Sequence, residues 1–166
     1  MKRRDVLPLL GIAGGLVATS ALAQGQASEP EQLARRFTAA LSAHDMQSFA
    51  DLFADDYVNH QISAAAPAPA ADKSARQLTV DFFAARLAGL PDLAVAIEAL
   101  VVGPDRVAAS FVYTGTHLGT YFGVPPTGRK LRFTSCDIFA VRDGKIVEHW
   151  GMGDIAGIMA QLKAPS

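Results

Sequence analysis

The chain has 166 residues, of which 50% are hydrophobic and 19% are charged, and its formal net charge is −1. These values fit one globular domain and argue against a disordered or collagen-like chain. Lys and Arg number 15 against 16 Asp and Glu, so no positive surplus is available to neutralise a nucleic-acid backbone, and nucleic acid is not expected as a partner. The single cysteine, Cys136, has no disulfide partner in the chain and is interpreted as a small buried hydrophobic residue.

The first 23 residues have the pattern of an export signal. Lys2, Arg3 and Arg4 precede an apolar run that contains glycines, and Ala21-Leu22-Ala23 resembles a cleavage site. The paired arginines favour the twin-arginine route over general secretion, and the run is too short and glycine-rich to span a membrane comfortably. We therefore expect a signal peptide over 1–23, a leader over 24–29, a single domain over 30–166, a periplasmic or secreted bacterial location, and no membrane contact after cleavage.

Helical spacing dominates the first half of the domain. Helices are predicted from about Pro30, from about Asp45, which can act as an N-cap, and from Ser74 to about Leu90. The apolar residues that carry this spacing are Leu33, Phe37 and Leu41 in the first helix, Met46, Phe49, Leu52 and Phe53 in the second, and Leu78, Phe82, Phe83 and Leu87 in the third. The Ala- and Pro-rich stretch 63–72 is interpreted as a surface loop.

From Asp92 onward the apolar period changes to two, which predicts four strands and a closing helical turn. The alternating residues are Leu93, Val95, Ile97, Ala99 and Val101, then Val107, Ala109, Phe111 and Tyr113, then Leu131, Phe133, Phe139 and Val141, with a last strand over about 145–150 and a turn carrying Ile155, Ile158, Met159 and Leu162. Helices followed by an antiparallel meander indicate the α+β class, with a curved antiparallel sheet wrapped by N-terminal helices around an apolar pocket.

Asp137 falls on the apolar side of the third predicted strand. A buried carboxylate is costly unless a partner stabilises it, and the following turn decides that partner. A three-residue loop with Gly144 in a left-handed bulge position places Asp137 opposite His149, whereas a two-residue Asp143-Gly144 turn places it opposite Trp150. We favour the first register, because it puts Asp137 and His149 together on the inner face.

An imidazole beside a carboxylate in a dry pocket suits general acid–base chemistry, because the carboxylate fixes the tautomer of a ring that exchanges protons near neutral pH. The alternative is a buried salt bridge that only holds two strands in register. Asn59, His60 and His117 are further polar groups near the ends of elements. The histidines lack the spacing of metal ligands, so no metal is expected.

Several segments resemble the SnoaL-like polyketide cyclase, or ester cyclase, family. They are Tyr57-Val58-Asn59-His60, Gly115-Thr116-His117-Leu118-Gly119, Gly123-Val124-Pro125-Pro126-Thr127-Gly128-Arg129, Asp137-Ile138-Phe139, and the run from Asp143 to Trp150 with Asp154 behind it. The resemblance runs from about Pro30 to Leu162. It implies the nuclear-transport-factor-two-like cone, similar to a cystatin roll, in which a curved sheet and helices surround an apolar pocket.

The resemblance also implies an activity. The family's cyclases close a ring in an aromatic polyketide methyl ester by an intramolecular aldol condensation, with an acid–base aspartate and no metal or organic cofactor. The position of that aspartate corresponds to Gly151 here, and a cavity histidine of the family corresponds to Asp137. His149, His117 and Asn59 match residues of the family motifs. The acid has in effect moved from one strand to its neighbour.

Two main hypotheses follow. In the first, the protein is a cofactor-free acid–base catalyst of the cyclase, isomerase or hydratase type on a small hydrophobic carbonyl compound: Asp137 moves the proton, His149 tunes or relays it, and His117 with Asn59 polarises an oxygen. In the second, the same pocket only binds a hydrophobic ligand. The residues expected to contact the ligand are Asn59, His60, Tyr113, Phe133 and Trp150. A structural module is a third alternative, because such sheets often form homodimers through the exposed face.

Overall fold

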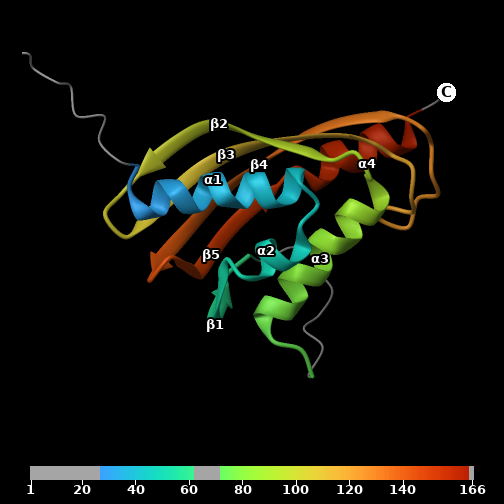
Figure 1. Ribbon diagram of the computed structural model, residues 1–166. Coiled ribbons are helices and arrows are strands. Elements are labelled where there is room, and N and C mark those ends of the chain that lie inside the picture. Colours follow the sequence, from blue (N-terminus) through green and yellow to red (C-terminus); the bar gives the residue numbers. More distant parts are fainter. Residues whose placement is uncertain (1–26, 62–71, 165–166) are drawn as a thin grey trace, which may run out of the picture.

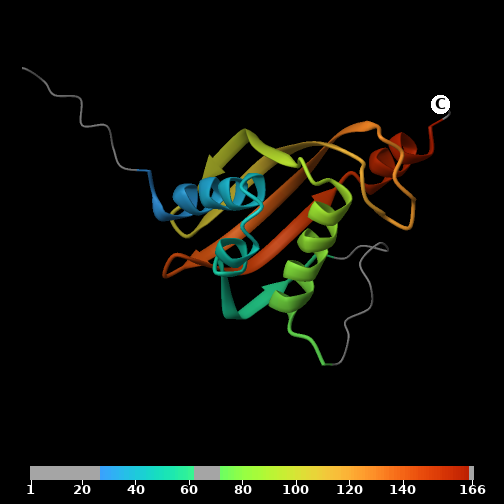
Figure 2. The same ribbon diagram turned by 45° about the vertical axis from the view of Figure 1, so that its right-hand side comes forward.

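Five strands form one curved sheet, and helices pack into its concave side (Figures 1 and 2). The computed structural model describes residues 27–61 and 72–164. The elements are α1 (Glu29–Ser42), α2 (Met46–Ala50), β1 (Phe53–Asn59), α3 (Ala75–Gly89), β2 (Ala94–Val102), β3 (Arg106–Thr116), β4 (Lys130–Arg142), β5 (Lys145–Gly153) and α4 (Ile155–Lys163). The strand order is β1-β5-β4-β3-β2, and the sheet is open. The predicted α+β class is therefore confirmed.

The three predicted helices form with the expected starts. Asp45 caps α2 by accepting a hydrogen bond from the Ser48 backbone N–H, and Ser74 and Gln77 make a reciprocal capping box at the start of α3. Each cap satisfies an N–H group that the first helical turn leaves without a partner. Leu33, Phe37 and Leu41 of α1 are buried against the sheet, as their spacing predicts.

Strand β1 was not predicted. The second helix ends at Ala50, and the residues assigned to its far end, Leu52 and Phe53, are buried in the turn and at the start of β1. Strand β1 runs parallel to β5, so the sheet is mixed rather than wholly antiparallel. Phe53 and Tyr57 are the only buried residues of β1, and their interval of four residues imitates helical spacing.

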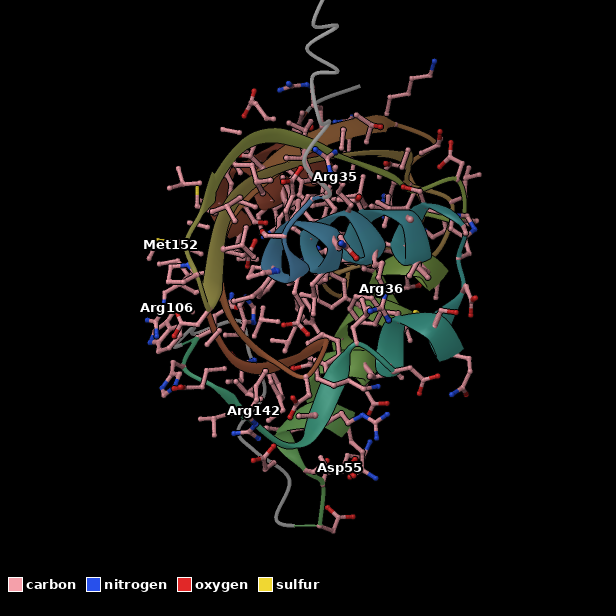
Figure 3. The ribbon with its side chains drawn as sticks, turned by 60° about the vertical axis from the view of Figure 1, so that its left-hand side comes forward. Arg35, Arg36, Asp55, Arg106, Arg142 and Met152 are labelled. Carbon is pink, nitrogen blue, oxygen red and sulfur yellow. The ribbon has the colours of Figure 1, made fainter. Side chains whose placement is uncertain are left out.

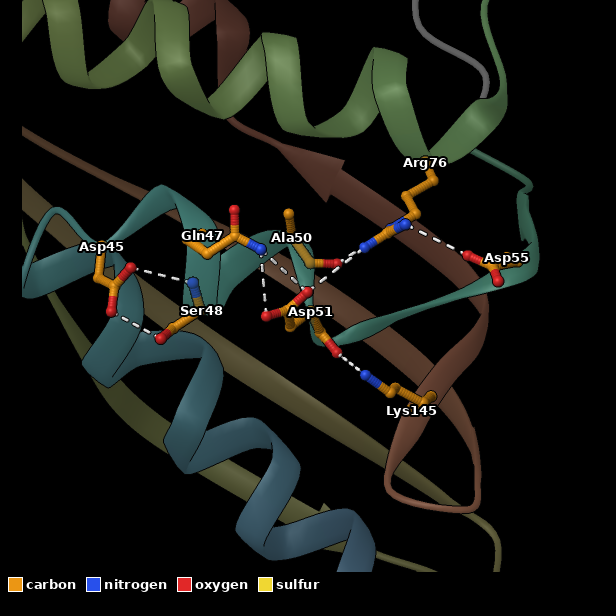
Figure 4. A network of polar contacts seen from close by, with 8 residues as sticks. All are labelled: Asp45, Gln47, Ser48, Ala50, Asp51, Asp55, Arg76 and Lys145. Carbon is orange, nitrogen blue, oxygen red and sulfur yellow. Dashed lines mark hydrogen bonds and ion pairs between the residues drawn. The ribbon is translucent and has the colours of Figure 1, made fainter.

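Arg76 and Lys145 hold the corner between α2 and β1 (Figure 4). Arg76, on the first turn of α3, donates from Nε to the Ala50 carbonyl at 3.1 Å and from Nη1 to Asp55 Oδ1 at 3.2 Å. Lys145, at the start of β5, donates to the carbonyl of Asp51. These contacts tie the start of β1 and the turn before it to α3 and β5, the elements that carry Thr79 and His149 of the site.

Two expectations about side-chain direction were wrong. A bulge at Glu98 in β2 changes the alternation between Ile97 and Ala99, so Val101 is 72% exposed and Leu100 is half-buried. Cys136 is exposed; it pairs with Met152 on the outer face of the sheet, and Met152 projects away from the helices (Figure 3). Val107, Ala109, Phe111 and Tyr113 of β3 face the core, as predicted.

The core is an aromatic cluster between the helices and the sheet. The ring of Phe37 lies 5.1 to 5.5 Å, between centroids, from the rings of Phe49, Phe83, Phe111 and Phe139. This cluster joins α1, α2 and α3 to β3 and β4, and it supplies much of the hydrophobic stabilisation. None of the described helices is long and apolar enough to cross a membrane. The predicted signal peptide and nearly all of the predicted surface loop lie outside the described residues.

Candidate active site

The turn between β4 and β5 does not follow the favoured prediction. Asp143 and Gly144 have φ angles of 52° and 68° and form a two-residue turn that pairs Arg142 with Lys145. A bulge at Val147 then shifts the register by one more residue, between Ala140 and Val141 of the partner strand. Asp137 therefore pairs with Gly151, and His149 pairs with Phe139. The alternative two-residue turn thus forms, but its register holds only for Arg142–Lys145 and Val141–Ile146, so neither predicted partner lies opposite Asp137.

Asp137 and His149 nevertheless meet on the inner face. His149 Nε2 lies 2.7 Å from Asp137 Oδ1, and the two residues are 5% and 8% exposed respectively. They are diagonal neighbours on adjacent strands, a position from which long side chains still reach each other. Gly151 provides the space: a Cβ atom at this position would lie 2.4 Å from Asp137 Oδ1 and 2.5 Å from His149 Nε2. The predicted buried Asp–His contact is thus present.

A serine holds the second oxygen of the carboxylate. Ser135 Oγ donates to Asp137 Oδ2 at 2.5 Å and lies 3.4 Å from the Tyr113 hydroxyl. Ser135 is two residues before Asp137 on the same strand face and is itself buried. Both carboxylate oxygens of Asp137 therefore lie at hydrogen-bond distance from a side-chain partner.

The second ring nitrogen of His149 lies at the start of a chain of hydrogen bonds through two hydroxyl groups. Its Nδ1 lies 3.2 Å from the Tyr57 hydroxyl, which accepts from Thr79 Oγ1 at 3.4 Å, and Thr79 in turn accepts from Asn59 Nδ2 at 3.4 Å. The Tyr57 O–H then donates to Nδ1, and the ring proton sits on Nε2, facing Asp137. Burial raises the pKa of the Tyr57 hydroxyl, so this group stays a donor.

A buried arginine that was not predicted lies beyond Ser135. Arg86 of α3 is 5% exposed and donates from Nε to the Tyr121 hydroxyl at 3.1 Å. Its guanidinium carbon lies 4.7 to 5.3 Å from the ring centroids of Phe82, Phe83, Tyr113 and Phe133. Burial alone would lower the pKa of Arg86, but Tyr121, Tyr113 and Asp137 outweigh it and raise the pKa. The side chain is therefore a permanent cation.

The remaining predicted residues lie in three places. Tyr113 and Phe133 stack in parallel on the inner face, with centroids 5.1 Å apart. His60 stacks on Trp150 at 4.5 Å and contacts Glu148 at 2.8 Å, outside the buried pair. His117 is fully buried in the loop after β3, where its Nδ1 lies 2.9 Å from Thr127 Oγ1.

His117 is separate from the buried pair. Ala109 is the β3 partner of Asp137, and His117 lies eight residues further along the chain, on the order of 25 Å of extended backbone. Within the described residues, no hydrogen bond connects it to Asp137, His149 or Asn59. The structure thus brings Asp137, His149 and Asn59 into one network and leaves His117 in another.

A cavity of about 460 Å³ opens beside the pair, at the end of β5 that β1 does not cover. Its lining includes Ser135 and Gly151, the two residues that contact or face Asp137. Gln61, Asp154 and Ile155 lie at its other sides. The lining also includes Cys136 and Met152 of the outer face and does not include Asp137 or His149, so the cavity adjoins residues next to the pair rather than the carboxylate itself. Among the described residues, no three His, Cys, Asp or Glu side chains are placed to hold a metal ion together.

An open curved sheet with helices in its concave side and a buried acid–imidazole pair defines a cone-fold protein with a polar group inside an apolar interior. The model of the family of SnoaL-like polyketide cyclases matches residues 31–162. The chain belongs to this family.

Relatives of known structure share the fold over most of their length. IdmH from Streptomyces antibioticus, proposed to be a polyketide cyclase, is 32% identical, with a TM-score of 0.69 over 80% of this chain and 97% of its own. TsrD from Streptomyces laurentii is 26% identical, with a TM-score of 0.69 over 82% and 96%. Nogalonic acid methyl ester cyclase from Streptomyces nogalater is 36% identical over 59 residues. That match covers 36% of this chain and spans less than half, 44%, of the relative.

Proposed function

We propose that the protein is a cofactor-free acid–base catalyst that moves a proton on a small hydrophobic carbonyl compound, in a reaction of the cyclase, isomerase or hydratase type. The observation that carries this proposal is the contact between Asp137 and His149 inside the sheet. A carboxylate that touches an imidazole in a water-poor site can remove a proton next to a carbonyl and return it elsewhere. Membership of the family supports the same type of chemistry.

In the proposed mechanism Asp137 is the base. The ligand reaches Asp137 past Ser135 and Gly151, which line the neighbouring cavity, and brings an acidic C–H group to the carboxylate. When Asp137 takes the proton, the electron pair of the broken C–H bond moves onto the carbonyl oxygen as an enolate, and return of the proton from Asp137 to a different carbon of the enolate re-forms the carbonyl and completes an isomerisation. His149 keeps its Nε2–H on Asp137 because Tyr57 donates to Nδ1. Asn59 acts on His149 only through Thr79 and Tyr57.

The place of Asp137 agrees with the altered family pattern. The resemblance puts the family acid at Gly151, and the Asp137 carboxylate lies 2.4 Å from the point where a side chain at this position would begin. An acid on β4 therefore presents its oxygens where an acid on β5 would otherwise start. This substitution of one strand for its neighbour supports a retained proton-transfer site rather than a lost one.

The experiment follows hydrogen exchange. The wild-type protein is incubated with 2-tetralone in D₂O, and loss of the α-proton signals is recorded by NMR. We expect catalysed exchange that falls by about 10²- to 10⁴-fold in Asp137→Asn. Asp105→Asn, which changes an exposed carboxylate at the β2–β3 turn, is the matched control and should exchange at the wild-type rate. Equal rates in Asp137→Asn and the wild type would contradict the proposal.

A second candidate function is passive ligand binding. It is favoured by the fact that both oxygens of Asp137 already accept hydrogen bonds, from His149 and Ser135. A pocket of this kind would keep its ligand affinity in both Asp137→Asn and His149→Gln. Native mass spectrometry of the wild-type protein and the two variants, purified from their source, shows whether all three retain the same small molecule. Retention in all three, together with no Asp137-dependent exchange on 2-tetralone, would favour the passive pocket.

We also propose export to a bacterial periplasm and assembly as a homodimer. The export proposal rests on Arg3-Arg4 and the Ala21-Leu22-Ala23 site. Replacing Arg3-Arg4 with Lys-Lys should retain the precursor in the cytoplasm, and unchanged secretion would contradict the twin-arginine route. The dimer proposal draws on Ile138 and Met152, exposed apolar residues of β4 and β5. Light scattering of the purified protein tests it.

A further inference from the structure

Arg86 is a buried cation for which the proposed proton transfer has no use. Within residues 27–61 and 72–164, no carboxylate oxygen lies within 4.0 Å of its guanidinium. The surrounding groups are four aromatic rings and the Tyr121 hydroxyl. Buried charges in proteins are normally paired, because desolvation of an unpaired ion is expensive. Arg86 therefore has no carboxylate in direct contact, and against the effect of burial its pKa is kept raised by the hydroxyls of Tyr121 and Tyr113 and by the more distant Asp137.

The free donors of Arg86 reach accessible space. A guanidinium has five N–H donors, and the Nε donor is satisfied by Tyr121. No hydrogen bond within the described residues involves Nη1 or Nη2. The fully buried side-chain nitrogens and oxygens without a partner, within these residues, comprise His117 Nε2 alone. The terminal nitrogens of Arg86 thus make no hydrogen bond of 3.5 Å or less within these residues, although the guanidinium lies near the Tyr113 hydroxyl, and they are not among the fully buried unpaired atoms.

A chain of contacts connects Arg86 to the proton-transfer site. The guanidinium lies over the Tyr113 ring, the Tyr113 hydroxyl contacts Ser135, and Ser135 donates to Asp137. Along β4, Phe133, the partner of Tyr113, is four residues from Asp137, or about 13 Å of backbone. The parallel rings of Tyr113 and Phe133, which are 1% and 3% exposed, lie between Arg86 and this part of β4 as an apolar layer.

We propose that Arg86 binds a carboxylate of the ligand, so that the ligand is a planar, conjugated carbonyl compound that carries an acid group. This inference rests on the proposed function for the second end of the molecule, which reacts at Asp137. Arg86 is suited to the task because its planar donors match the two oxygens of a carboxylate, and the aromatic rings hold it in one orientation. The carboxylate of the ligand would then be the direct counter-ion of the buried Arg86 guanidinium.

The test compares two probes of the same shape. Isothermal titration measures the affinity of 2-naphthoate, which has a carboxylate, and of methyl 2-naphthoate, which has none. For the wild-type protein we expect 2-naphthoate to bind about 10- to 100-fold more tightly, the usual value of a hydrogen bond to a charged group. Arg86→Met should abolish the preference, and Arg86→Lys should keep part of it, because Lys retains the charge but not the paired donors.

The control lies on the same helix. Arg76→Met removes a surface arginine paired with Asp51 and Asp55, and it should leave the preference unchanged. Equal affinity for both probes in the wild type, absence of 2-naphthoate binding, or a preference that survives in Arg86→Met would each overturn the proposal. The comparison of the two probes in the wild-type protein tests the proposal even if Arg86→Met does not fold.

The same variants separate this inference from the proposed function. Asp137→Asn should lose hydrogen exchange on 2-tetralone but keep the preference for 2-naphthoate, because Arg86 is unchanged. If Asp137→Asn exchanges normally while the wild type still prefers 2-naphthoate, the proton-transfer role fails and the carboxylate site stands. If the preference is missing while exchange depends on Asp137, only the carboxylate site fails.

Discussion

His149 contacts Asp137 at 2.7 Å although the two residues do not face each other across the sheet. The residue opposite Asp137 is Gly151, and the carboxylate and the imidazole meet over its missing side chain. The pair thus depends on three local features: a two-residue turn, a bulge at Val147, and a glycine.

Gly151→Ala is expected to destabilise the protein by about 1–3 kcal/mol, because the new methyl group would overlap both Asp137 and His149 and push them apart. Thermal unfolding measures the loss. Gly153→Ala is the control, since a Cβ atom there meets only Ile155 Cδ1 at 3.9 Å. If the two variants unfold at the same temperature, the close approach at Gly151 is not the reason for the glycine.

Tyr57→Phe should free Nδ1 of His149 from its donor. We expect the free energy of unfolding to fall by about 1 kcal/mol, the usual value of one hydrogen bond. The Nε2–H tautomer should also lose its fixed preference. Nitrogen-15 NMR of the histidine rings reads the tautomer directly, and an unchanged His149 spectrum would show that Asp137 alone fixes it.

The buried phenols predict a loss of stability at alkaline pH. Burial raises the pKa of Tyr113 to about 12 and also raises that of Tyr57. Between pH 10 and 12 the unfolded chain loses phenol protons that the native protein keeps, so the free energy of unfolding falls as pH rises, by roughly 1 kcal/mol per pH unit for each phenol. Below pH 10 these groups contribute no slope.

Urea unfolding of the wild type and of Tyr113→Phe at pH 9, 10 and 11 checks this prediction. The variant cannot ionise at position 113, and its stability should decline less steeply above pH 10. Parallel curves for the two proteins would mean that the Tyr113 phenol ionises equally in both states.

Ser74→Ala should cost about 1 kcal/mol, because the Ser74 hydroxyl accepts the Gln77 N–H in the capping box. Ser28→Ala provides a control at the same position of another helix, since the Ser28 side chain makes no cap hydrogen bond in α1. Denaturant unfolding of the two variants should show a loss only for Ser74→Ala. A similar loss in both would indicate a general effect of serine at a helix start.

The elements with one buried face were predictable from the sequence. Every second residue from Val107 to Tyr113 and from Leu131 to Phe139 is buried, as the apolar alternation of these strands predicts. The same alternation identified Asp137 as a buried acid. Strand β1 was not predicted because only two of its residues, Phe53 and Tyr57, are buried. Their interval of four residues suits a helix equally well.

The pairing register of neighbouring strands could not be predicted from the sequence. The bulges at Glu98 and Val147 arise where two strands pair, and either strand alone gives no sign of them. In β4 and β5 the shorter turn and the bulge each moved the register by one residue, and together they returned His149 to the face of Asp137. The correct pair was therefore inferred from an incorrect alignment.

Arg86 could have been found by the reasoning that found Asp137. Thr79, Phe83 and Arg86 are four and three residues apart, so they share one stripe of α3, and all three are buried. A polar residue on an apolar stripe is the helical counterpart of Asp137 on its strand. Charged residues usually lie at the solvent side of a helix, which is why this one was passed over.

The parallel pairing of β1 with β5 joins Asn59 to His149, residues that are far apart in the sequence. Contacts with such long loops form late in folding, since the chain must first lose the entropy of closing them. Tyr57 and His149 come from these two strands, so the imidazole acquires its tautomer only when the edge strand docks. A ribosome-bound chain that ends before Lys145 would hold most of the core and the Asp137 carboxylate, but not the imidazole that contacts it.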